Sequence, residues 1–510
     1  MQVQILSSVP LNMTIHAISF GTSGHRGILG DSFTLSHVCA IAYAVADLLK
    51  SQNPFPKIVL GYDPRQGNSP TLEPGSLTHA VAAILSQEKI HVYVLDHPSP
   101  TPLVSWVIEQ NALDGGLILT ASHNPPDYNG IKFNDATGAP APIFLTQQIE
   151  KKANLILSTQ TLIAGDIDKA YLTFIDKDSD FSKALSAHLS TLESPSLTQL
   201  KLAIDVKHGT TGRVWKALGK HCHFQTLFIH DVPMSDFGGL EPNPTKKGAL
   251  DTLKQYAVSE GASLSVAHDP DGDRHVILDE TGAPLTPEET ALIIGDMLLK
   301  KKLPLSGIVT TLASSRIIRQ WCDRNGLSFD ETEVGFKYFA PYFQKARDRH
   351  AWVIGVESSG GISASVHTME KCGFFPVLMV MAALSLSGKS LSELKKTVMS
   401  PLGQSIFIEE EYHFEQRVKP LLGTFLAAAT QQITAPFFEN EVAEVITIDG
   451  LKINFYGDTW VLLRLSGTEP VARIYAEASE LSIANSLVNQ AKGMLIAHGF
   501  VPISDQNKII

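Results

Sequence analysis

Two stretches of the chain resemble each other at a nearly constant separation, and this repeat limits the folds available to the chain. The sequence Ser-His-Asn-Pro at 122–125 is followed by Asp-Ala-Thr-Gly-Ala-Pro at 135–140. The sequence Ala-His-Asp-Pro at 267–270 is followed by Asp-Glu-Thr-Gly-Ala-Pro at 279–284. The offsets are 145 and 144 residues, so one register with a single-residue gap aligns both pairs. Short Gly/Pro loops also match by chance, but the shared register favours two copies of one structural unit.

Around both copies the chain alternates between strand-like and helix-like segments. Short runs rich in β-branched or large apolar residues are typical of buried strands, and they begin at residues 57, 91, 117, 202, 307 and 352. Helical segments lie between them, including 38–49 and a helix that starts at Thr286-Pro287, where Glu289 completes the pattern of a capping box. This alternation predicts α/β units with mainly parallel sheets.

A third unit and a different C-terminal region complete the predicted organisation. The strand at 352–356 runs into Glu-Ser-Ser-Gly-Gly at 357–361, and beyond Pro401 antiparallel strands precede a helix over about 483–498. The predicted fold class is therefore α/β, with three similar mixed α/β sandwich domains and a smaller C-terminal α+β domain. We place the domains at 1–160, 161–283, 284–400 and 401–510. Because open sheets hold ligands at the carboxyl ends of strands, each of the first three domains would offer one loop.

Charge argues against two classes of partner. The 510 residues contain 41 Lys and Arg against 52 Asp and Glu, a net charge of −11, and the chain has no basic run. A protein that binds nucleic acid or an anionic membrane surface needs concentrated positive charge. We therefore expect neither partner.

Other features predict a soluble cytoplasmic protein. The longest apolar run, 374–384, has 11 residues and is too short to span a bilayer. Arg26 is the first Lys or Arg of the chain, so we expect no charged segment of a secretory signal. The four cysteines form no C-x-x-C pair, which argues against a zinc ribbon and a disulfide framework.

The segment 269–274, Asp-Pro-Asp-Gly-Asp-Arg, is the strongest local sign of chemistry. The carboxylates of Asp269, Asp271 and Asp273 would repel one another unless a cation lies between them. Mg²⁺ fits best, because it binds few protein carboxylates together with phosphate oxygens. A calcium-binding helix-loop-helix is rejected, since its sixth position needs Gly where Arg274 stands. A solvated acidic turn remains the alternative.

The first repeat carries a candidate nucleophile. Ser122 is expected at the tip of a buried strand, with His123 beside it and Lys132 ten residues further on. A hydroxyl, a base and a cation suit nucleophilic or phosphoryl-transfer chemistry. An Asx turn with a structural role remains the alternative for this segment.

Further loops offer groups that bind phosphate or sugar hydroxyls. The segment 464–470, Arg-Leu-Ser-Gly-Thr-Glu-Pro, places a guanidinium, two hydroxyls and glycine-freed amides together, which suits three phosphate oxygens, although a plain hairpin turn is the alternative. Segment 21–27 is a second polar loop with one cation, Arg26. Segment 357–361 can accept hydrogen bonds from sugar hydroxyls, and Lys337 offers another cation.

Taken in this order, the loops resemble those of the α-D-phosphohexomutase family, which includes phosphoglucomutases and phosphomannomutases. The resemblance runs from Phe20 to about Ala478 and is most specific in the Ser122 loop and in the segment 269–274. It implies four domains around one central active-site cleft. It also implies that a phosphoryl group on Ser122 passes to a hexose monophosphate, giving a 1,6-bisphosphate that reorients and returns its other phosphoryl group.

The resemblance also implies a role for each candidate residue. Ser122 would carry the phosphoryl group, His123 and Lys132 would assist proton transfer, and Arg26 would help them. One Mg²⁺ per chain would be held by a phosphoryl oxygen on Ser122 and by Asp269, Asp271 and Asp273. The substrate-binding set would be Arg274, Lys337, Glu357, Ser359, Arg464, Ser466, Gly467 and Thr468. In that set, Glu357 and Ser359 would read sugar hydroxyls, and the four residues from Arg464 onward would clamp the non-reacting phosphate.

We therefore expect a phosphohexomutase that interconverts hexose 1-phosphate and hexose 6-phosphate, with glucose and/or mannose as the sugar and a glucose 1,6-bisphosphate-type activator. The alternatives are a phosphoglucosamine or phosphopentose mutase, a non-catalytic sugar-phosphate-binding protein and a phosphatase. Departures from the family pattern at Val356, Ser358, Gly361 and Cys372 put the sugar in question, not the phosphoryl chemistry. The expected partner is a sugar phosphate, and the chain would be a monomer or a weak homo-oligomer.

Overall fold

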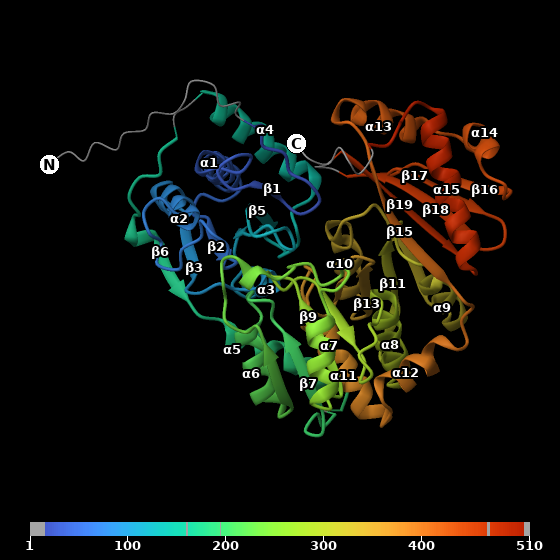
Figure 1. Cartoon of the computed structure of the whole chain (residues 1–510). Coiled ribbons are helices and arrows are strands. Elements are labelled where there is room, and N and C mark those ends of the chain that lie inside the picture. The colour runs from blue at the N-terminus through green and yellow to red at the C-terminus, as the bar shows by residue number, and fades with distance from the viewer. Residues whose placement is uncertain (1–15, 160–161, 194, 467–469, 504–510) are drawn as a thin grey trace.

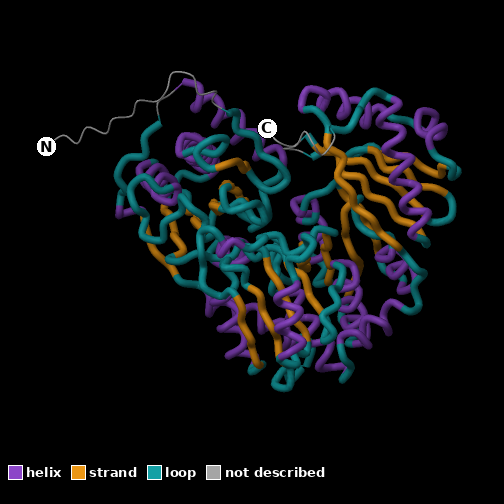
Figure 2. The backbone as a smooth tube through the Cα atoms, in the orientation of Figure 1, coloured by secondary structure: helices purple, strands orange, loops and turns teal. Residues whose placement is uncertain are grey.

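Four β-sheets follow one another along the chain, each with helices packed against it (Figure 1). The computed structural model describes residues 16–159, 162–193, 195–466 and 470–503. The four units follow an arc, with the first (blue) and the last (red) at opposite sides and the second and third between them (Figure 1). The tube view separates the four groups of strands (Figure 2).

The first sheet has the strand order β1-β5-β4-β2-β3-β6. Strands β4, β2, β3 and β6 pair in parallel, whereas β5 pairs antiparallel with both β4 and β1. The strands are β1 (His25–Ile28), β2 (Lys57–Tyr62), β3 (His91–Leu95), β4 (Gly115–Leu119), β5 (Tyr128–Asp135) and β6 (Leu172–Ile175). The helices are α1 (Leu35–Gln52), α2 (Leu77–Gln87), α3 (Thr101–Gln110) and α4 (Ile143–Thr159). Strand β6 lies beyond residue 160 and still belongs to this sheet, because it pairs with β3.

The second sheet has the order β10-β9-β7-β8 and the third the order β12-β11-β13-β14. The second unit contains β7 (Lys201–Asp205), β8 (Gln225–Ile229), β9 (Leu264–His268), β10 (His275–Leu278), α5 (Asp178–Ser190), α6 (Gly212–Cys222) and α7 (Asp251–Ser259). The third contains β11 (Leu305–Thr311), β12 (Ser328–Thr332), β13 (Trp352–Glu357), β14 (Gly361–Ala364), α8 (Pro287–Lys300), α9 (Ile317–Asn325), α10 (Ala340–Arg347), α11 (Phe375–Ser387) and α12 (Leu391–Met399).

The three sheets share one pattern of four strands. In each, an antiparallel hairpin (β4–β5, β9–β10 or β13–β14) adds its first strand in parallel to a central strand (β2, β7 or β11), which pairs in parallel with a fourth (β3, β8 or β12). The prediction of three similar mixed α/β units is therefore confirmed, including the third unit. The three hairpin loops occupy equivalent places in their sheets.

The sequence repeat corresponds to two copies of the same turn. The Asp135 carboxylate accepts hydrogen bonds from the backbone N–H and the hydroxyl of Thr137, at 2.8 and 2.6 Å. The Asp279 carboxylate accepts the same two bonds from Thr281, at 2.9 and 2.6 Å. The following glycines have φ values of 78° and 80°, a left-handed conformation that glycine adopts without strain. The repeat thus records shared local structure and not chance.

The fourth sheet is entirely antiparallel, with the order β15-β19-β18-β17-β16. Its strands are β15 (Ile406–His413), β16 (Val442–Ile446), β17 (Leu451–Phe455), β18 (Thr459–Leu465) and β19 (Val471–Ala478). Its helices are α13 (Lys419–Ala428), α14 (Gln431–Thr434) and α15 (Leu481–Ala497). This unit confirms the predicted α+β character of the C-terminal region.

Side chains cap the N-termini of three helices, as the sequence predicts for α8. The Thr286 hydroxyl accepts from the backbone N–H of Glu289, and the Glu289 carboxylate accepts from the backbone N–H of Thr286, so the predicted capping box at the start of α8 is confirmed. Thr34 and Ser390 cap α1 and α12 in the same way. These caps fix where the chain turns from loop to helix.

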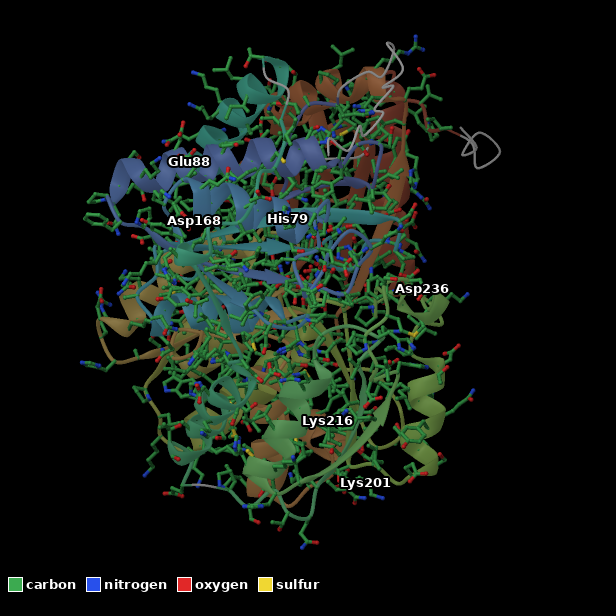
Figure 3. The ribbon with its side chains drawn as sticks, turned by 90° about the vertical axis from the view of Figure 1, so that its left-hand side faces the viewer. His79, Glu88, Asp168, Lys201, Lys216 and Asp236 are labelled. Carbon is green, nitrogen blue, oxygen red and sulfur yellow. The ribbon has the colours of Figure 1, made fainter. Side chains whose placement is uncertain are left out.

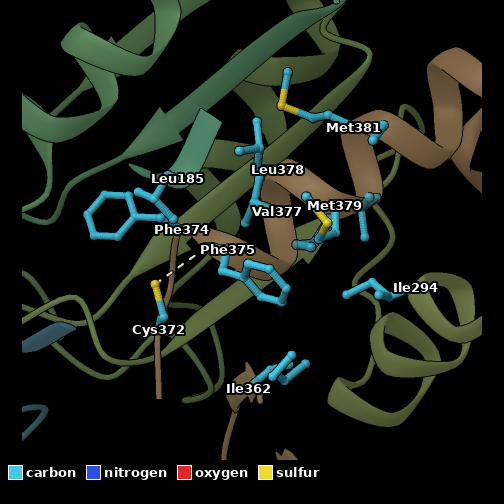
Figure 4. Packing of buried hydrophobic residues seen from close by; sticks show 14 of the residues in the cluster. Leu185, Ile294, Ile362, Cys372, Phe374, Phe375, Val377, Leu378, Met379 and Met381 are labelled. Carbon is cyan, nitrogen blue, oxygen red and sulfur yellow. Dashed lines mark hydrogen bonds between the residues drawn. The ribbon is translucent and has the colours of Figure 1, made fainter. Parts of the chain in front are cut away.

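One hydrophobic core runs through the first three units. It contains Leu103 of the first unit, Leu185 of the second and Ile294 of the third, and α11 packs in its middle (Figure 4). All residues of α11 from Phe375 to Leu384 are buried, as expected for a helix that is apolar on every side. The contact fixes the three hairpin loops relative to one another.

The length and apolarity of the described helices determine whether any of them could cross a bilayer. No single described helix is long and apolar enough to cross a bilayer. Helices α11 and α12 together meet the criterion, but the chain bends by 90° between them.

Several charged side chains on the outer surface pair with partners in their own unit. Glu88 accepts from Lys50 at 2.6 Å and Asp168 from Lys89 at 2.7 Å in the first unit. Lys216 pairs with Asp231 at 2.7 Å in the second. Figure 3 shows Glu88 and Asp168 on the upper part of the molecule and Lys216 on the lower part. Exposed pairs of this kind contribute about 0–1 kcal/mol each, so they do not determine the fold.

Candidate active site

The hairpin loops of the first three units place their polar side chains at the carboxyl ends of β4, β9 and β13. Contacts between the loops are direct: the backbone N–H of His275 donates to the carbonyl of Gly360 at 3.3 Å, and that of Gly373 donates to the carbonyl of Gly272 at 3.1 Å. The edge where open α/β sheets bind ligands is thus shared by three sheets.

Ser122 lies directly above β4 and faces the second unit. Its hydroxyl donates to Oδ2 of Asp269 at 2.8 Å, across 147 residues of sequence. The side chain is 1% exposed, and its backbone has φ of 53°, in the left-handed region. That conformation costs about 1–2 kcal/mol for a residue with a side chain, so the surrounding structure has to stabilise it. The strain is typical of a functional turn.

The loop between β9 and β10 brings three carboxylates together. Asp269, Asp271 and Asp273 are fully buried, and each offers an oxygen within 4.8 Å of the others. Gly272 makes the turn possible: its φ is 65°, and a Cβ there would lie 2.5 Å from the Thr211 methyl group. Only glycine fits this turn.

This donor set fits a divalent cation. Oδ1 of Asp271 and Oδ1 of Asp273 are buried without a hydrogen-bond partner, which is costly for an ionised carboxylate. Burial, reinforced by the neighbouring Asp271 and Asp273 charges, raises the pKa of Asp269 well above its ordinary value. A hard cation would satisfy the unpaired oxygens and favour the ionised form of all three acids.

Two lysines already balance part of this negative charge. Lys132 on β5 donates to Oδ2 of Asp271 at 2.6 Å and to Oδ2 of Asp273 at 2.7 Å, and Lys371 lies 3.2 Å from the same Asp273 oxygen. Burial disfavours the Lys132 charge, but the two carboxylates outweigh it and raise the pKa of Lys132. Burial likewise favours neutral Asp273, but Lys132, Lys371 and Arg274 hold the pKa of Asp273 below its ordinary value.

Two other predicted catalytic side chains of the first unit, His123 and Arg26, contact the Ser122 loop. His123 Nδ1 lies 3.4 Å from the Ser122 hydroxyl, and burial, with nearby Arg274 and Arg26, keeps the pKa of His123 well below its ordinary value. These surroundings therefore favour the neutral imidazole of His123. Arg26 donates to the side-chain carbonyl of Asn124 at 2.9 Å, which holds its guanidinium over the loop.

The β13–β14 loop completes the site from the third unit. Glu357 ends β13 and is 6% exposed, and Ser359 is half-buried. Gly361 has no room for a side chain, since a Cβ there would lie 2.6 Å from the Lys371 side chain. The space that a larger residue would fill at this position therefore holds Lys371.

A pocket lies between the first and third units, beside the carboxylates. Its lining includes Lys132, Lys337, Lys371 and Glu370 together with loop 20–24. Burial lowers the pKa of Lys337, and burial raises the pKa of Glu370 to about 7. Three lysines around one pocket suit an anionic ligand.

Arg464 of the fourth unit is held in place by Asp449. Its Nε donates to Oδ2 of Asp449 at 2.7 Å, and the same oxygen accepts from the backbone N–H of Val334 at 2.8 Å. Ser466 is buried, and its backbone N–H donates to the carbonyl of Val471 at 2.8 Å. Two further predicted members of this loop, Gly467 and Thr468, lie outside the described residues.

Sequence reasoning missed several residues of this site. The Thr101 hydroxyl donates to Oδ2 of Asp271 at 2.9 Å, from the start of α3. Lys371 and Asp449 were not predicted either. No local pattern marks Thr101, because its partner is 170 residues away. Lys371 could have been suspected, since it follows the predicted sugar loop as an isolated cation.

Comparison with known families gives a match along most of the chain. Residues 17–159, 179–282 and 286–402 match the α/β/α domains I, II and III described for phosphoglucomutase/phosphomannomutase, and residues 424–492 match the C-terminal domain. The four matches follow the order of the four sheets.

Individual relatives agree with this match. A phosphoglucosamine/phosphogalactosamine mutase of Sulfurisphaera tokodaii is 28% identical, over 93% of this chain and 98% of that protein. A phosphoglucomutase/phosphomannomutase of Thermococcus kodakarensis is 27% identical, over 90% and 94%. The solved structure of a phosphoglucomutase/phosphomannomutase family protein of Burkholderia thailandensis has a TM-score of 0.76 at 20% identity and covers 95% of this chain and 98% of its own.

The fold and the site together define an α/β phosphotransferase. More particularly, the chain belongs to the phosphoglucomutase/phosphomannomutase family, the α-D-phosphohexomutases. It is an enzyme, a mutase that transfers a phosphoryl group within its substrate. Enzymes of this family depend on Mg²⁺, and the buried carboxylates offer a matching set of ligands. The alternative of a non-catalytic binding protein is set aside.

Proposed function

We propose that the chain interconverts the 1-phosphate and 6-phosphate of a hexose, glucose and/or mannose, through a phosphoserine at Ser122 and a 1,6-bisphosphate. The observation that carries the proposal is the hydrogen bond between Ser122 and Asp269, which joins a nucleophilic hydroxyl to three buried carboxylates. A serine in a strained turn beside such a cluster suits transfer of a phosphoryl group to and from its oxygen. A glucose 1,6-bisphosphate-type activator would load the serine.

Asp269, Asp271 and Asp273 would hold the Mg²⁺, with a phosphoryl oxygen on Ser122 as a further ligand. When bound, the ion would neutralise charge on the transferring phosphoryl oxygens. His123, neutral and 3.4 Å from the serine oxygen, is suited to move a proton there. Lys132 would assist this proton transfer with help from Arg26, and both cations would stabilise the charge that develops there; Arg274 lies on the same loop as the carboxylates.

The remaining predicted residues would bind the rest of the substrate. Glu357 and Ser359 would accept and donate hydrogen bonds to sugar hydroxyls, and Lys337 would contribute positive charge from the pocket. Arg464 and Ser466, with Gly467 and Thr468, would clamp the phosphate that is not reacting. Because the bisphosphate returns in the opposite orientation, this clamp must accept either end of the sugar.

A phosphoglucosamine mutase is a second candidate, because the relative from Sulfurisphaera tokodaii carries that name at similar identity. Phosphopentose mutase activity remains the other alternative within the family. At Gly361, the Lys371 side chain fills the space beside the sugar loop. A turnover assay on several sugar phosphates distinguishes these candidate substrates.

The test is a turnover assay on a panel of sugar 1-phosphates: glucose, mannose, glucosamine and ribose, each with Mg²⁺ and a trace of bisphosphate. We expect one hexose to be isomerised and Ser122→Ala to lose at least about 10³-fold in kcat. Ser105→Ala, at a buried serine of the same unit that contacts Gly138, is the matched control and should remain active. Steady release of inorganic phosphate, or full activity of Ser122→Ala, would contradict the proposal.

A further inference from the structure

A buried hydrogen-bond network lies behind the Ser122 loop, and the proposed function does not use it. Its side chains are Asp63 and Arg65, which follow β2, and Thr120, which follows β4. All three are fully buried. They therefore reach the substrate only through the loop itself.

Arg65 uses all five of its N–H donors. Nε donates to Oδ2 of Asp63 at 3.0 Å. The other four donors go to main-chain carbonyls of one short segment, at 2.5–3.0 Å, namely those of Ser122, Asn124, Pro125 and Tyr128. A planar guanidinium has a rigid donor geometry, so four carbonyls bound to it are fixed relative to one another. Arg65 thus acts as a template for the backbone of the Ser122 loop.

Asp63 links this template to the reacting residue through Thr120. The Thr120 hydroxyl donates to Oδ2 of Asp63 at 2.6 Å, and its oxygen accepts the backbone N–H of Ser122 at 2.8 Å. Because the hydroxyl proton is committed to the carboxylate, the lone pair of the same oxygen is directed at Ser122. Both the N–H and the C=O of Ser122 are therefore held by this network.

A residue of the second unit covers the Arg65 guanidinium. The centroid of the Phe237 ring lies 4.8 Å from the guanidinium carbon of Arg65. This contact excludes water from the Arg65 charge and strengthens its hydrogen bonds, since a low-dielectric surrounding weakens them less than water does. The loop that holds Ser122 is thus fixed by both units that form the metal site.

We infer that Arg65, Asp63 and Thr120 are positioning residues for Ser122, holding its loop in the strained reactive conformation before substrate binds. The inference rests on the proposed function at Ser122. Phosphoryl transfer depends chiefly on the placement of the reacting oxygen, and a displacement of about 1 Å costs on the order of 100-fold in rate. Loss of this network should therefore lower kcat and leave KM nearly unchanged.

The test compares three variants of the full chain with Mg²⁺ present. Thr120→Val removes the hydroxyl and keeps the shape, whereas Thr120→Ser keeps the hydroxyl. Thr78→Val is the matched control, because the Thr78 hydroxyl is equally buried, donates to the Ser69 carbonyl at 2.8 Å and accepts the Ser69 N–H at 2.9 Å. Measured quantities are Tm, kcat, KM and the single-turnover rate at which a hexose 1,6-bisphosphate phosphorylates Ser122, followed by intact-protein mass.

We expect Thr120→Val to lose about 100-fold in kcat and in the phosphorylation rate, with KM within about threefold of the wild type. Thr120→Ser should recover most of the loss, and Thr78→Val should lower Tm without lowering either rate. Equal rates for Thr120→Val and Thr78→Val would overturn the inference, as would failure of Thr120→Ser to recover activity. A wild type that turns over no sugar phosphate, or an active Ser122→Ala, would instead overturn the proposed function.

Arg65→Lys gives an independent measurement on the template. An ammonium has three donors and cannot bind five acceptors in a plane, so a folded Arg65→Lys protein should lose at least as much kcat as Thr120→Val. A folded Arg65→Lys protein with wild-type rates would overturn the role of Arg65.

Discussion

Lys132 occupies a position between Asp271 and Asp273 to which a divalent cation is also attracted. Together with Lys371, and with Arg274 at 4.0 Å from Oδ1 of Asp273, Lys132 supplies positive charge that opposes the three carboxylates. The lysine thus allows the loop to fold without metal, while the unpaired Oδ1 atoms of Asp271 and Asp273 keep an affinity for one.

Lys132→Met tests this balance. Removing one partner of a buried ion pair leaves uncompensated charge and costs about 3–5 kcal/mol, so the variant should be less stable than the wild type in a chelator. Mg²⁺ should raise the Tm of the variant by more than it raises that of the wild type, measured by thermal denaturation. Lys337→Met, which removes a lysine that lies over the Tyr338 ring, is the control. Equal Mg²⁺-dependent shifts in variant and wild type would show that Lys132 does not balance the carboxylates.

At the scale of elements, the turn between β16 and β17 joins the fourth sheet to the third unit. Asp449 in this turn binds Arg464 on β18 and the backbone of Val334 through the same oxygen. Nε of Arg464 is bound to Asp449, and within the part of the chain that the structure describes no group accepts a hydrogen bond from its two terminal nitrogens, so these could bind a phosphate. The turn therefore orients the proposed clamp.

Arg464→Ala and Asp449→Ala should both raise KM with little change in kcat. Charge-assisted hydrogen bonds are worth about 1.5–3 kcal/mol, which predicts a rise of roughly 10- to 100-fold for Arg464→Ala and a smaller one for Asp449→Ala. The double variant should be no worse than Arg464→Ala, because Asp449 acts through Arg464. Arg417→Ala, at an exposed arginine of the same unit, is the control. If the two substitutions raised KM additively in the double variant, Asp449 would not act through Arg464.

Elements and loop chemistry could be predicted from the sequence because their signals are local. The capping box of α8, the strand that begins at Trp352 and the repeated Asp-Thr turn each depend on residues a few positions apart. Contacts across units gave no such signal. Thr101 contacts Asp271 only because the first and second units pack together. From the sequence alone, Arg65 has no feature that distinguishes it from a surface arginine, although the fold buries it completely.

At the scale of the whole molecule, the second and third units meet through two histidines, the half-buried His188 and the buried His367. Nε2 of His188 on α5 lies 3.2 Å from Nδ1 of His367, with Phe375 packed against both rings and Arg347 bound to the His367 carbonyl. Burial lowers the pKa of His188 from 6.5 to about 4 and lowers that of His367 as well. The interface therefore favours the neutral form of both histidines.

This interface predicts a loss of stability in mild acid. Between pH 6.5 and about 4 the unfolded chain binds a proton at His188 that the folded chain excludes, so stability falls as the pH falls, by about 1.4 kcal/mol per pH unit for one histidine. His188→Gln keeps a hydrogen-bonding group and removes one titration. The pH dependence of its urea midpoint between pH 7 and 5 should be shallower than that of the wild type. An unchanged slope would place the acid sensitivity elsewhere.

The most direct measurement follows the phosphoryl group itself. The protein is labelled on Ser122 with radioactive hexose 1,6-bisphosphate, freed of excess reagent, and mixed with unlabelled hexose 1-phosphate and Mg²⁺ in a rapid-quench apparatus. We predict that the label leaves Ser122 at a rate no slower than kcat and appears in hexose bisphosphate and hexose 6-phosphate. Label that stays on the protein through many turnovers, or that appears as inorganic phosphate, would contradict the account.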